Sequence, residues 1–265
     1  METLMKICTW NVNSVKARKS LVLEWLKHRN NDIDILCFQE IKTVDKDFPF
    51  EDFERVGFEC HVFGQKSYHG VAICTKTPPA LVRKGFGEKD WDEQKRIILV
   101  KIGGINLINV YAPHGSERGT EKFEYKQGWY RRLITFLKDN FSPLDPVLIL
   151  GDFNIAHQDI DVYSPEELAD VIGTLPEERA LFEELLNLRF NDIYRRFYPD
   201  NKQFTWWDYI GGAIWKDEGM RIDYILCTHS LLEKIKHIEV DLWPRKRKTP
   251  TPSDHAPLII DLENN

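Results

Sequence analysis

An acid and an amide follow shortly after an unbroken apolar run. In PVLILGDFNIAHQDID, residues 146–161, the run 147–150 is typical of a strand buried on both faces, and Gly151 separates it from Asp152 and Asn154. Side chains two positions apart on an extended chain point to the same side, so we expect Asp152 and Asn154 to project together. The pattern predicts a small polar site at the end of a core strand.

Five other strand-like runs also carry polar side chains at one end. Three of them finish in such residues, and the two latest in the chain begin with them. If the two late strands run antiparallel to the others, all six polar ends lie along one rim of the fold. The polar ends, besides Asp152 and Asn154, are Asn11 and Asn13 of MKICTWNVN, Gln39 and Glu40 of DIDILCFQEIK, Asn109, Tyr111 and His114 of INLINVYAPHG, Arg221 and Asp223 of RIDYILC, and Asp254 and His255 of SDHAPLIIDL.

Oxygen atoms dominate the side chains expected at this rim. Carboxylate and amide oxygens suit Mg²⁺ or Mn²⁺, whereas a zinc site would need Cys and His at close spacing. Converging carboxylates repel one another, and a divalent cation together with a phosphate substrate relieves that repulsion. A carboxylate can take a proton from water, while amides, a tyrosine hydroxyl and a protonated His contact the phosphate. We therefore expect phosphate-ester hydrolysis.

Each of these residues also has a plainer interpretation. A single Asp, Glu or Asn at a strand end is commonly a turn or helix-cap residue. A single His is commonly a packed or surface side chain. The recurrence of the same chemistry at six strand ends is what favours a site.

Three amphipathic segments lie between the strands and would position them. Residues 20–30, 125–141 and 175–188 place apolar side chains at helical spacing. Strand, helix and strand follow one another twice, from ICTWNVN to ILCFQE and from INVYAPH to LILGDFN, which indicates a weak internal duplication. A two-sheet sandwich flanked by helices accommodates this order. Because no low-complexity linker divides the chain, we expect one domain over residues 1–265.

The charge of the chain leaves a nucleic-acid partner open. The net charge of −6 argues against such a partner, but basic side chains gather in three places that could follow a phosphate backbone. Solvated surface faces are the alternative explanation. The three groups are Lys16, Arg18 and Lys19; Arg118, Lys122, Lys126, Arg131 and Arg132; and the RKRK loop from Arg245 to Lys248.

Cysteine content and hydropathy indicate the compartment. The chain has no run of about 18 apolar residues, so we expect no transmembrane helix and no membrane partner. Five cysteines form no CxxC pair, and Cys8, Cys37, Cys74 and Cys227 lie in strand-like runs. Buried free thiols in a reducing cytoplasm are the expected state.

The order of the motifs resembles that of a known family. TWNVN, LCFQEIK, GVAICTK, INVYAPHG, LILGDFNIAHQDID, FTWWDY, GMRIDYIL and PSDHAP follow one another as in the exonuclease III family of abasic-site endonucleases, within the endonuclease/exonuclease/phosphatase superfamily. The resemblance spans essentially the whole chain. It implies a four-layer α/β sandwich, like that of deoxyribonuclease I, in which two mixed, mainly antiparallel sheets pack together between helices. It also implies Mg²⁺-dependent cleavage of DNA, with Mn²⁺ as a substitute ion.

The resemblance assigns roles to individual residues. Glu40 resembles the principal metal ligand, and Asp152 resembles the residue that activates or orients the attacking water. Tyr111 is similar to the hydroxyl that assists the leaving oxygen, while Asp223 would orient His255 against the phosphate. The catalytic set implied is Tyr111, Asp152, Asn154, Asp223 and His255, and the metal set is Asn11, Glu40, Asp152, Asn154, Asp254 and His255.

The resemblance also implies a pocket for a flipped-out abasic sugar. An apolar slot too small for a base would admit a baseless deoxyribose and reject an ordinary nucleotide. Adjacent aromatic residues cannot easily both face a pocket, so we favour Trp206 as the wall and Trp207 as a packing residue. The substrate-binding set implied is Trp206, Trp207, Met220, Ile222, His114 and Arg118.

Two positions depart from familiar members of the family. Asn13 stands where some relatives carry Asp, which would weaken the metal site. His114 replaces a Gln or Asn, which puts the DNA contacts of that loop in doubt. The basic loop from Arg245 to Lys248 is expected to grip the DNA backbone near the site.

The resemblance predicts a DNA-repair nuclease. It would hydrolyse the phosphodiester 5′ to abasic sites in double-stranded DNA and leave a 3′-hydroxyl, with 3′-to-5′ exonuclease activity and processing of blocked 3′ ends, acting as a monomer. One alternative is a phosphatase of the same superfamily acting on inositol phosphates or sphingomyelin. Another is a non-catalytic nucleic-acid binding module, which would be expected to have lost at least one residue of the catalytic set.

Overall fold

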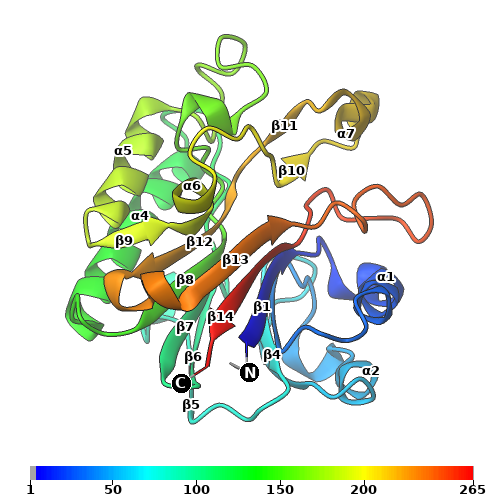
Figure 1. Cartoon of the computed structure of the whole chain (residues 1–265). Coiled ribbons are helices and arrows are strands. Elements are labelled where there is room, and N and C mark those ends of the chain that lie inside the picture. Colours follow the sequence, from blue (N-terminus) through cyan, green and yellow to red (C-terminus); the bar gives the residue numbers. More distant parts are fainter. Residues whose placement is uncertain (1–3, 265) are drawn as a thin grey trace.

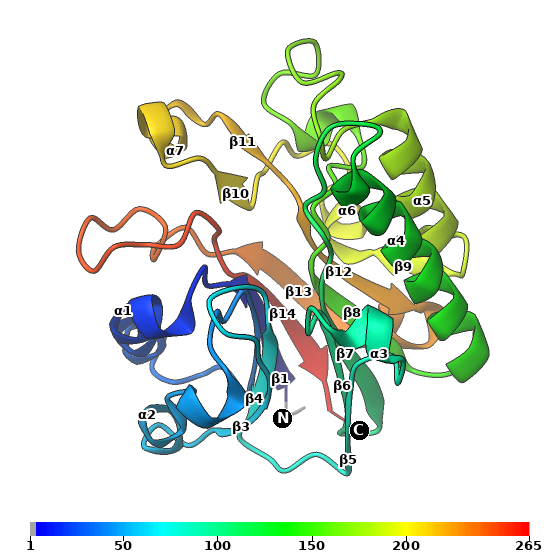
Figure 2. The same ribbon diagram turned by 180° about the vertical axis from the view of Figure 1, so that it is seen from behind.

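The structure is a computed structural model that describes residues 4–264. Residues 1–3 and 265, at the two ends of the predicted domain, lie outside the described part. Two six-stranded sheets pack face to face, and helices cover the outer face of each (Figures 1 and 2). The predicted four-layer α/β sandwich is confirmed.

The first sheet contains both ends of the described chain. Its neighbouring strands are antiparallel except for the pair β1 and β2, which are parallel. The strands, in sheet order, are β13 (Ile235–Val240), β14 (Leu258–Glu263), β1 (Leu4–Asn11), β2 (Ile35–Gln39), β4 (Val71–Thr75) and β3 (Glu59–Phe63).

The second sheet is built on the same plan from the middle of the chain. Here β7 and β8 are the parallel pair, and the other neighbours are antiparallel. Its strands, in sheet order, are β5 (Leu81–Lys84), β6 (Ile97–Ile102), β7 (Ile105–Tyr111), β8 (Val147–Asp152), β12 (Asp223–Thr228) and β9 (Phe190–Asp192). The two parallel pairs correspond to the two predicted strand, helix and strand units.

Apolar side chains fill all three spaces between the four layers. Ile7, Ile73, Leu148 and Ile225 belong to the core between the sheets. Another core joins the first sheet to α1 and α2, and a third joins the second sheet to α4 and α5. The helices are α1 (Val15–His28), α2 (Phe50–Glu54), α3 (Lys89–Asp92), α4 (Glu121–Asn140), α5 (Pro176–Leu186), α6 (Ile193–Phe197) and α7 (Ala213–Lys216), with 3₁₀ turns at Asp45–Asp47, Asp159–Asp161, Ile210–Gly212 and His229–Lys234.

Two of the predicted helices begin earlier than their apolar pattern indicates. The side chain of Ser14 accepts a hydrogen bond from the Ala17 amide, so α1 starts at Val15 rather than at residue 20. Thr120 caps α4 in the same way by accepting from Phe123. In both cases a capping side chain starts the helix within a polar first turn.

The polar strand ends meet at one rim, as the sequence predicts. Asp223, the first residue of β12, pairs directly with Asp152, the last residue of β8, in an antiparallel ladder. The strand that follows His255, β14, is likewise antiparallel to β1. The prediction that the two late strands run against the others is therefore confirmed.

An arm stands above this rim. It consists of the two-stranded ladder of β10 (Trp206–Trp207) and β11 (Gly219–Met220), with α7 near its tip (Figure 1). The loop between β13 and β14 lies at the same end of the molecule (Figure 2). Within residues 4–264, none of the helices combines the length and apolar character needed to cross a membrane.

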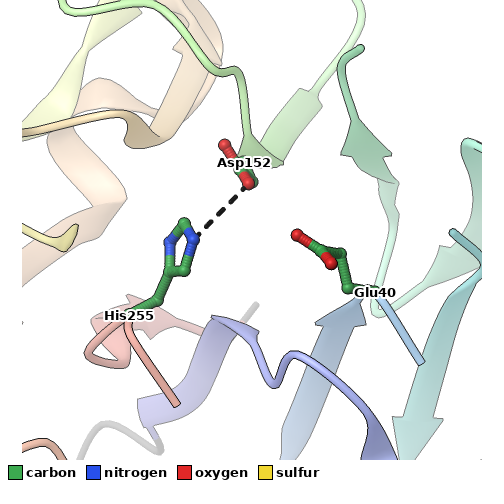
Figure 3. Close-up of side chains that lie close together, drawn as sticks. All are labelled: Glu40, Asp152 and His255. Atoms are coloured by element: carbon green, nitrogen blue, oxygen red, sulfur yellow. Dashed lines mark ion pairs between the residues drawn. The ribbon is translucent and has the colours of Figure 1, made fainter. Parts of the chain in front are cut away.

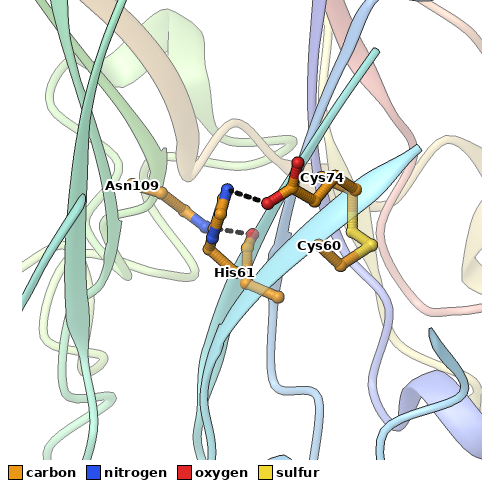
Figure 4. Close-up of a disulfide and its surroundings, with 6 residues drawn as sticks. Cys60, His61, Cys74 and Asn109 are labelled. Atoms are coloured by element: carbon orange, nitrogen blue, oxygen red, sulfur yellow. Dashed lines mark hydrogen bonds and ion pairs between the residues drawn. A yellow bond between two sulfur atoms is a disulfide. The ribbon is translucent and has the colours of Figure 1, made fainter. Parts of the chain in front are cut away.

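The prediction that Cys74 is a free thiol is wrong. Cys60 of β3 and Cys74 of β4 form a disulfide (Figure 4). The two residues are direct partners in the antiparallel ladder, with their Cα atoms 3.9 Å apart, so their side chains leave the same face of the sheet. Cys8, Cys37 and Cys227 are free and buried, as predicted.

Candidate active site

Three side chains from three separate strand ends converge at the rim. Glu40 follows β2, Asp152 ends β8 and His255 precedes β14 (Figure 3). Their ligand atoms all lie within 4.8 Å of one another, and His255 Nε2 is 3.8 Å from Asp152 Oδ2. Asp152 and His255 are almost fully buried, whereas Glu40 is partly exposed.

Asn11 connects the two carboxylates. Its Nδ2 group donates to Glu40 Oε1 at 2.9 Å and to Asp152 Oδ2 at 2.8 Å, and its Oδ1 accepts from the Asn13 amide. Asn11 is fully buried at the end of β1, next to β2 in the sheet. A neutral amide can therefore hold the two like charges at a fixed separation.

Lys42 forms an ion pair with Glu40. Its Nζ lies 2.8 Å from Glu40 Oε2 and 2.5 Å from Asn13 Oδ1. Burial would raise the pKa of Glu40, but Lys42 and the Asn11 amide outweigh it and the pKa lies below its ordinary value. Glu40 is therefore a carboxylate at neutral pH. Sequence reasoning missed Lys42, although it lies within the quoted QEIK motif.

Asp223 holds the imidazole of His255 from the side opposite Asp152. His255 Nδ1 lies 2.8 Å from Asp223 Oδ2. Burial disfavours the charged imidazolium, but Asp223 and Asp152 together raise the pKa of His255 above its ordinary value. Burial has the opposite effect on Asp152, whose pKa is raised despite the nearby His255. The geometry therefore favours a protonated His255 at neutral pH.

Tyr111 ends β7 and reaches the same cluster. Burial and the neighbouring Glu40 raise the pKa of the Tyr111 hydroxyl, which therefore keeps its proton. The guanidinium of Arg96 lies 4.6 Å from the centre of the Tyr111 ring and donates to the Tyr111 carbonyl at 3.0 Å. Arg96 also contacts His69 Nδ1 at 3.1 Å. No sequence pattern indicates this role of Arg96.

Gly151, which precedes Asp152 in β8, is required because β7 lies so close to it. A Cβ atom at Gly151 would lie 2.0 Å from the Val110 carbonyl oxygen, and the φ angle of Gly151 is +137°. The chain then turns so that Asp152 Oδ1 accepts from the Asn154 amide at 2.9 Å. Asn154 Nδ2 donates to the Ala112 carbonyl at 2.9 Å, which fixes the amide beside Asp152.

A cavity of about 350 Å³ opens beside these residues. Trp206, Met220 and Ile222 supply its apolar wall, and His114 also lines it. Trp207 does not line this cavity; it is fully buried in a separate core with Phe204. Of the two adjacent tryptophans, Trp206 is therefore at the cavity wall and Trp207 is a packing residue.

Two basic residues expected to contact DNA have other partners. Arg118 does not line the cavity and pairs with Glu177 and Asp170 on the surface. In the basic loop, Arg245 is buried and donates to the carbonyls of Trp207 and Asp254. Arg245 is thus not free to grip a DNA backbone, because its guanidinium braces the loop.

Asp254 lines the cavity but stands apart from the three converging ligands. Its Oδ1 accepts from Asn13 Nδ2 at 3.0 Å, and its Oδ2 accepts from Trp206 Nε1 at 3.2 Å. Burial would raise the pKa of Asp254, but His255 and these donors lower it. Asp254 therefore couples the cavity wall to the loop of Asn13.

The donor set fits a divalent metal ion. Glu40 and Asp152 offer carboxylate oxygens within one small volume, and a ring nitrogen of His255 lies within 4.8 Å of them. Oxygen-rich sets of this kind suit hard cations. The lowered pKa of Glu40 keeps that ligand ionised.

Comparisons with known proteins identify the family. The sequence profile of the Endonuclease/Exonuclease/phosphatase family matches residues 8–255. The chain belongs to this family. Exodeoxyribonuclease III of Haemophilus influenzae is 35% identical to it over 98% of this chain and 100% of its own length. The resemblance to the exonuclease III family is thereby confirmed.

Solved structures of family members share the fold. An AP endonuclease from Archaeoglobus fulgidus is 37% identical, with a TM-score of 0.92 over 97% of this chain and 99% of its own. The 3′ phosphatase NExo from Neisseria, solved bound to a product DNA hairpin, is also 37% identical, with a TM-score of 0.92 over 98% of this chain and 99% of its own.

Proposed function

We propose that this protein is a DNA-repair nuclease that hydrolyses the phosphodiester 5′ to an abasic site in double-stranded DNA. The reaction leaves a 3′-hydroxyl. The same site would remove nucleotides from 3′ ends and process blocked 3′ ends, since these reactions also hydrolyse a phosphate ester of a 3′ oxygen.

One observation supports this proposal above the others. The cluster of Glu40, Asp152 and His255 lies at the wall of a cavity of about 350 Å³ whose other side is apolar. A deoxyribose without a base is small enough to enter such a cavity, whereas an intact nucleotide must also unstack and fit its base. An inositol phosphate, with a hydroxyl on almost every carbon, would meet few polar partners on Trp206 and Ile222.

The names of relatives agree with this substrate class. A protein with 37% identity carries the name AP endonuclease, and another was solved with a product DNA hairpin. We propose that the present chain acts on the same class of DNA substrate.

Asp152 and Asn154 would act on the attacking water. Asp152, held by the Asn11 and Asn154 amides, would accept a proton from the attacking water. The Asn154 amide, fixed by the Ala112 carbonyl, would hold the water or a phosphate oxygen. The strand end holds both side chains at a fixed orientation, which favours in-line attack on phosphorus.

Tyr111 and His255 would act on the phosphate. The imidazolium of His255, oriented by Asp223, offsets the negative charge that develops on the phosphate oxygens. The protonated hydroxyl of Tyr111 can donate to the departing 3′ oxygen as the bond between phosphorus and that oxygen breaks.

We propose that Mg²⁺ is the native ion and that Mn²⁺ can replace it. Glu40 and Asp152 would hold it, with Asn11 keeping the two carboxylates in place and His255 close by. When bound, the ion polarises the phosphate and offsets the charge of the carboxylates.

Cleavage of an end-labelled duplex with one tetrahydrofuran abasic analogue tests the proposal. We expect a single cut 5′ to the analogue with Mg²⁺, none with EDTA, and much slower degradation of an undamaged duplex. If both duplexes were degraded equally from the 3′ end, the protein would instead be a non-selective exonuclease. Absence of any cleavage would contradict it.

A further inference from the structure

A buried ion pair lies behind the cavity. Lys126 Nζ on α4 is 2.5 Å from Glu178 Oε1 on α5, and the side chains are 1% and 0% exposed. From the sequence, Lys126 belongs to a group of basic side chains that could follow a phosphate backbone. That prediction is wrong for Lys126, because its side chain is buried. A buried ion pair is weak evidence for stability, because desolvation of two charges offsets their attraction.

Lys126 uses its remaining donors on two loops of the site. Its Nζ donates to the His114 carbonyl at 3.1 Å and to the Asn154 carbonyl at 2.8 Å. One loop follows β7 and the other follows β8. With Glu178, these contacts use all three hydrogens of the ammonium group.

Glu178 anchors a third loop. Its Oε2 accepts from the Gly173 amide at 2.6 Å and from the Leu175 amide at 3.1 Å. Gly173 itself lines the cavity. The ion pair therefore ties together three loops that contribute His114, Asn154 and Gly173 to one cavity.

The loops pack closely against one another and against Lys126. A Cβ atom at Gly115 would lie 3.0 Å from both Lys126 Cδ and Ile172 Cδ1, and one at Gly173 would lie 3.3 Å from the Asn154 carbonyl oxygen. Ile172 also lines the cavity. A shift of the ion pair would therefore be transmitted to the cavity wall.

We propose that Lys126 and Glu178 are positioning residues that set the width of the cavity and thereby the selectivity for a baseless sugar. Neither side chain lines the cavity, and both act through the three loops. This inference rests on the proposed function. The measurement that distinguishes positioning from stabilisation is the selectivity between abasic and undamaged DNA. Removal of a purely stabilising ion pair would leave this selectivity unchanged.

The double variant Lys126→Met/Glu178→Gln tests the proposal. It removes both charges together and leaves the Gln carbonyl as an acceptor for Gly173 and Leu175, but the His114 and Asn154 carbonyls lose their donor. The conservative variant Glu178→Gln keeps the Lys126 amine as donor to both carbonyls. Lys6→Met is the matched control, because Lys6 pairs with Asp261 at 2.8 Å on β1 and β14 and none of the cavity-lining residues is involved.

Rates on the abasic-analogue duplex and on an undamaged duplex are measured well below the melting temperature of each variant. We expect the ratio of the two rates to fall by about 10- to 100-fold in the double variant. The ratio should stay near wild type in Glu178→Gln and in Lys6→Met, even where the melting temperature falls. An unchanged ratio in the double variant, or an equal fall in Lys6→Met, would overturn the proposal.

Amide hydrogen exchange tests the positioning role independently of the proposed nuclease activity. We expect faster exchange in segments 113–116 and 154–156 of the double variant. If the wild-type protein cleaves neither duplex, the proposed function fails, whereas unchanged exchange in these segments overturns the positioning role by itself.

Discussion

Two aspartates face one imidazole but have different surroundings. Asp223 lies 2.8 Å from His255 Nδ1, while Asp152 Oδ2 is 3.8 Å from His255 Nε2 and also accepts from Asn11. Burial raises the pKa of Asp152, with Asp223 adding to the effect. In the proposed mechanism, Asp223 orients the ring and Asp152 takes the proton.

Replacement of the orienting carboxylate should therefore slow the reaction without preventing binding. In Asp223→Asn, His255 loses the partner that fixes its orientation and its charge. We expect the single-turnover cleavage rate to fall by about 10²- to 10⁴-fold, with DNA affinity measured by fluorescence anisotropy nearly unchanged. Asp261→Asn, far from the rim, is the control. A wild-type rate in Asp223→Asn would contradict the assigned role.

The adjacent tryptophans should give opposite results. Trp206→Ala removes a cavity wall and the donor to Asp254, so we expect lower selectivity for the abasic duplex over an undamaged one. Trp207→Ala removes a fully buried side chain and should lower the free energy of unfolding by about 3–5 kcal/mol. Urea denaturation and paired cleavage assays measure both effects. Loss of selectivity in Trp207→Ala alone would reverse the assignment.

At the scale of elements, strand ends from both sheets build the site. In one sheet, β1 supplies Asn11 and Glu40 directly follows β2, and in the other, β8 and β12 supply Asp152 and Asp223. The two sheets pack through a continuous apolar core, which fixes the distance between these ends. A change in sheet packing would therefore move the two halves of the site apart.

The ladder of β3 and β4 carries the disulfide. Because Cys60 and Cys74 are cross-strand partners, titration of thiols in denaturant without reductant should find three of the five cysteines reactive. Reduction should lower the melting temperature, since the bridge closes a loop with a sequence separation of 14 residues. Five reactive thiols before reduction would contradict the bridge and restore the sequence-based expectation.

At the scale of the whole molecule, strand directions could be predicted from sequence. The runs RIDYILC and SDHAPLIIDL begin with polar residues, while the earlier runs end with them, so convergence at one rim followed from strand polarity alone. The ion pair between Lys126 and Glu178 joins two distant segments and could not be predicted from any sequence pattern. Lys126 lies in a polar stretch of an amphipathic helix, and Glu178 is one of several acids in the first turn of another.

The disulfide was missed for a related reason. ECHVF, which contains Cys60, belongs to an edge strand whose side chains are mostly exposed or partly exposed. Its apolar pattern is too weak to indicate pairing with the strand of Cys74. Register between two strands is a tertiary property that neither sequence contains by itself.

Stability of the whole fold should depend on pH through a buried charge network. Asp161 accepts from Arg221 Nε at 2.7 Å and also pairs with Arg195. Burial would raise the pKa of Asp161, but the two guanidinium groups lower it below its ordinary value. A depressed carboxyl pKa contributes stability above the unfolded-state value of about 3.9, and this contribution is lost as pH falls through the folded-state value.

We therefore expect Asp161→Asn to lower the free energy of unfolding at pH 7 and to reduce its dependence on pH below about 4. Urea denaturation at a series of pH values measures both effects. Asp47→Asn, at an exposed pair with Lys16, provides a control with little change. A variant as stable as wild type at pH 7 would contradict the network's contribution.

The central claim is that Asp152 performs the chemistry of a site that recognises abasic DNA. The most direct test measures cleavage and binding together, for wild type and Asp152→Asn, on one tetrahydrofuran-containing duplex with Mg²⁺. We expect the variant to bind the duplex with near wild-type affinity and to cut it at least about 10²-fold more slowly. Cleavage by Asp152→Asn at the wild-type rate would contradict the account.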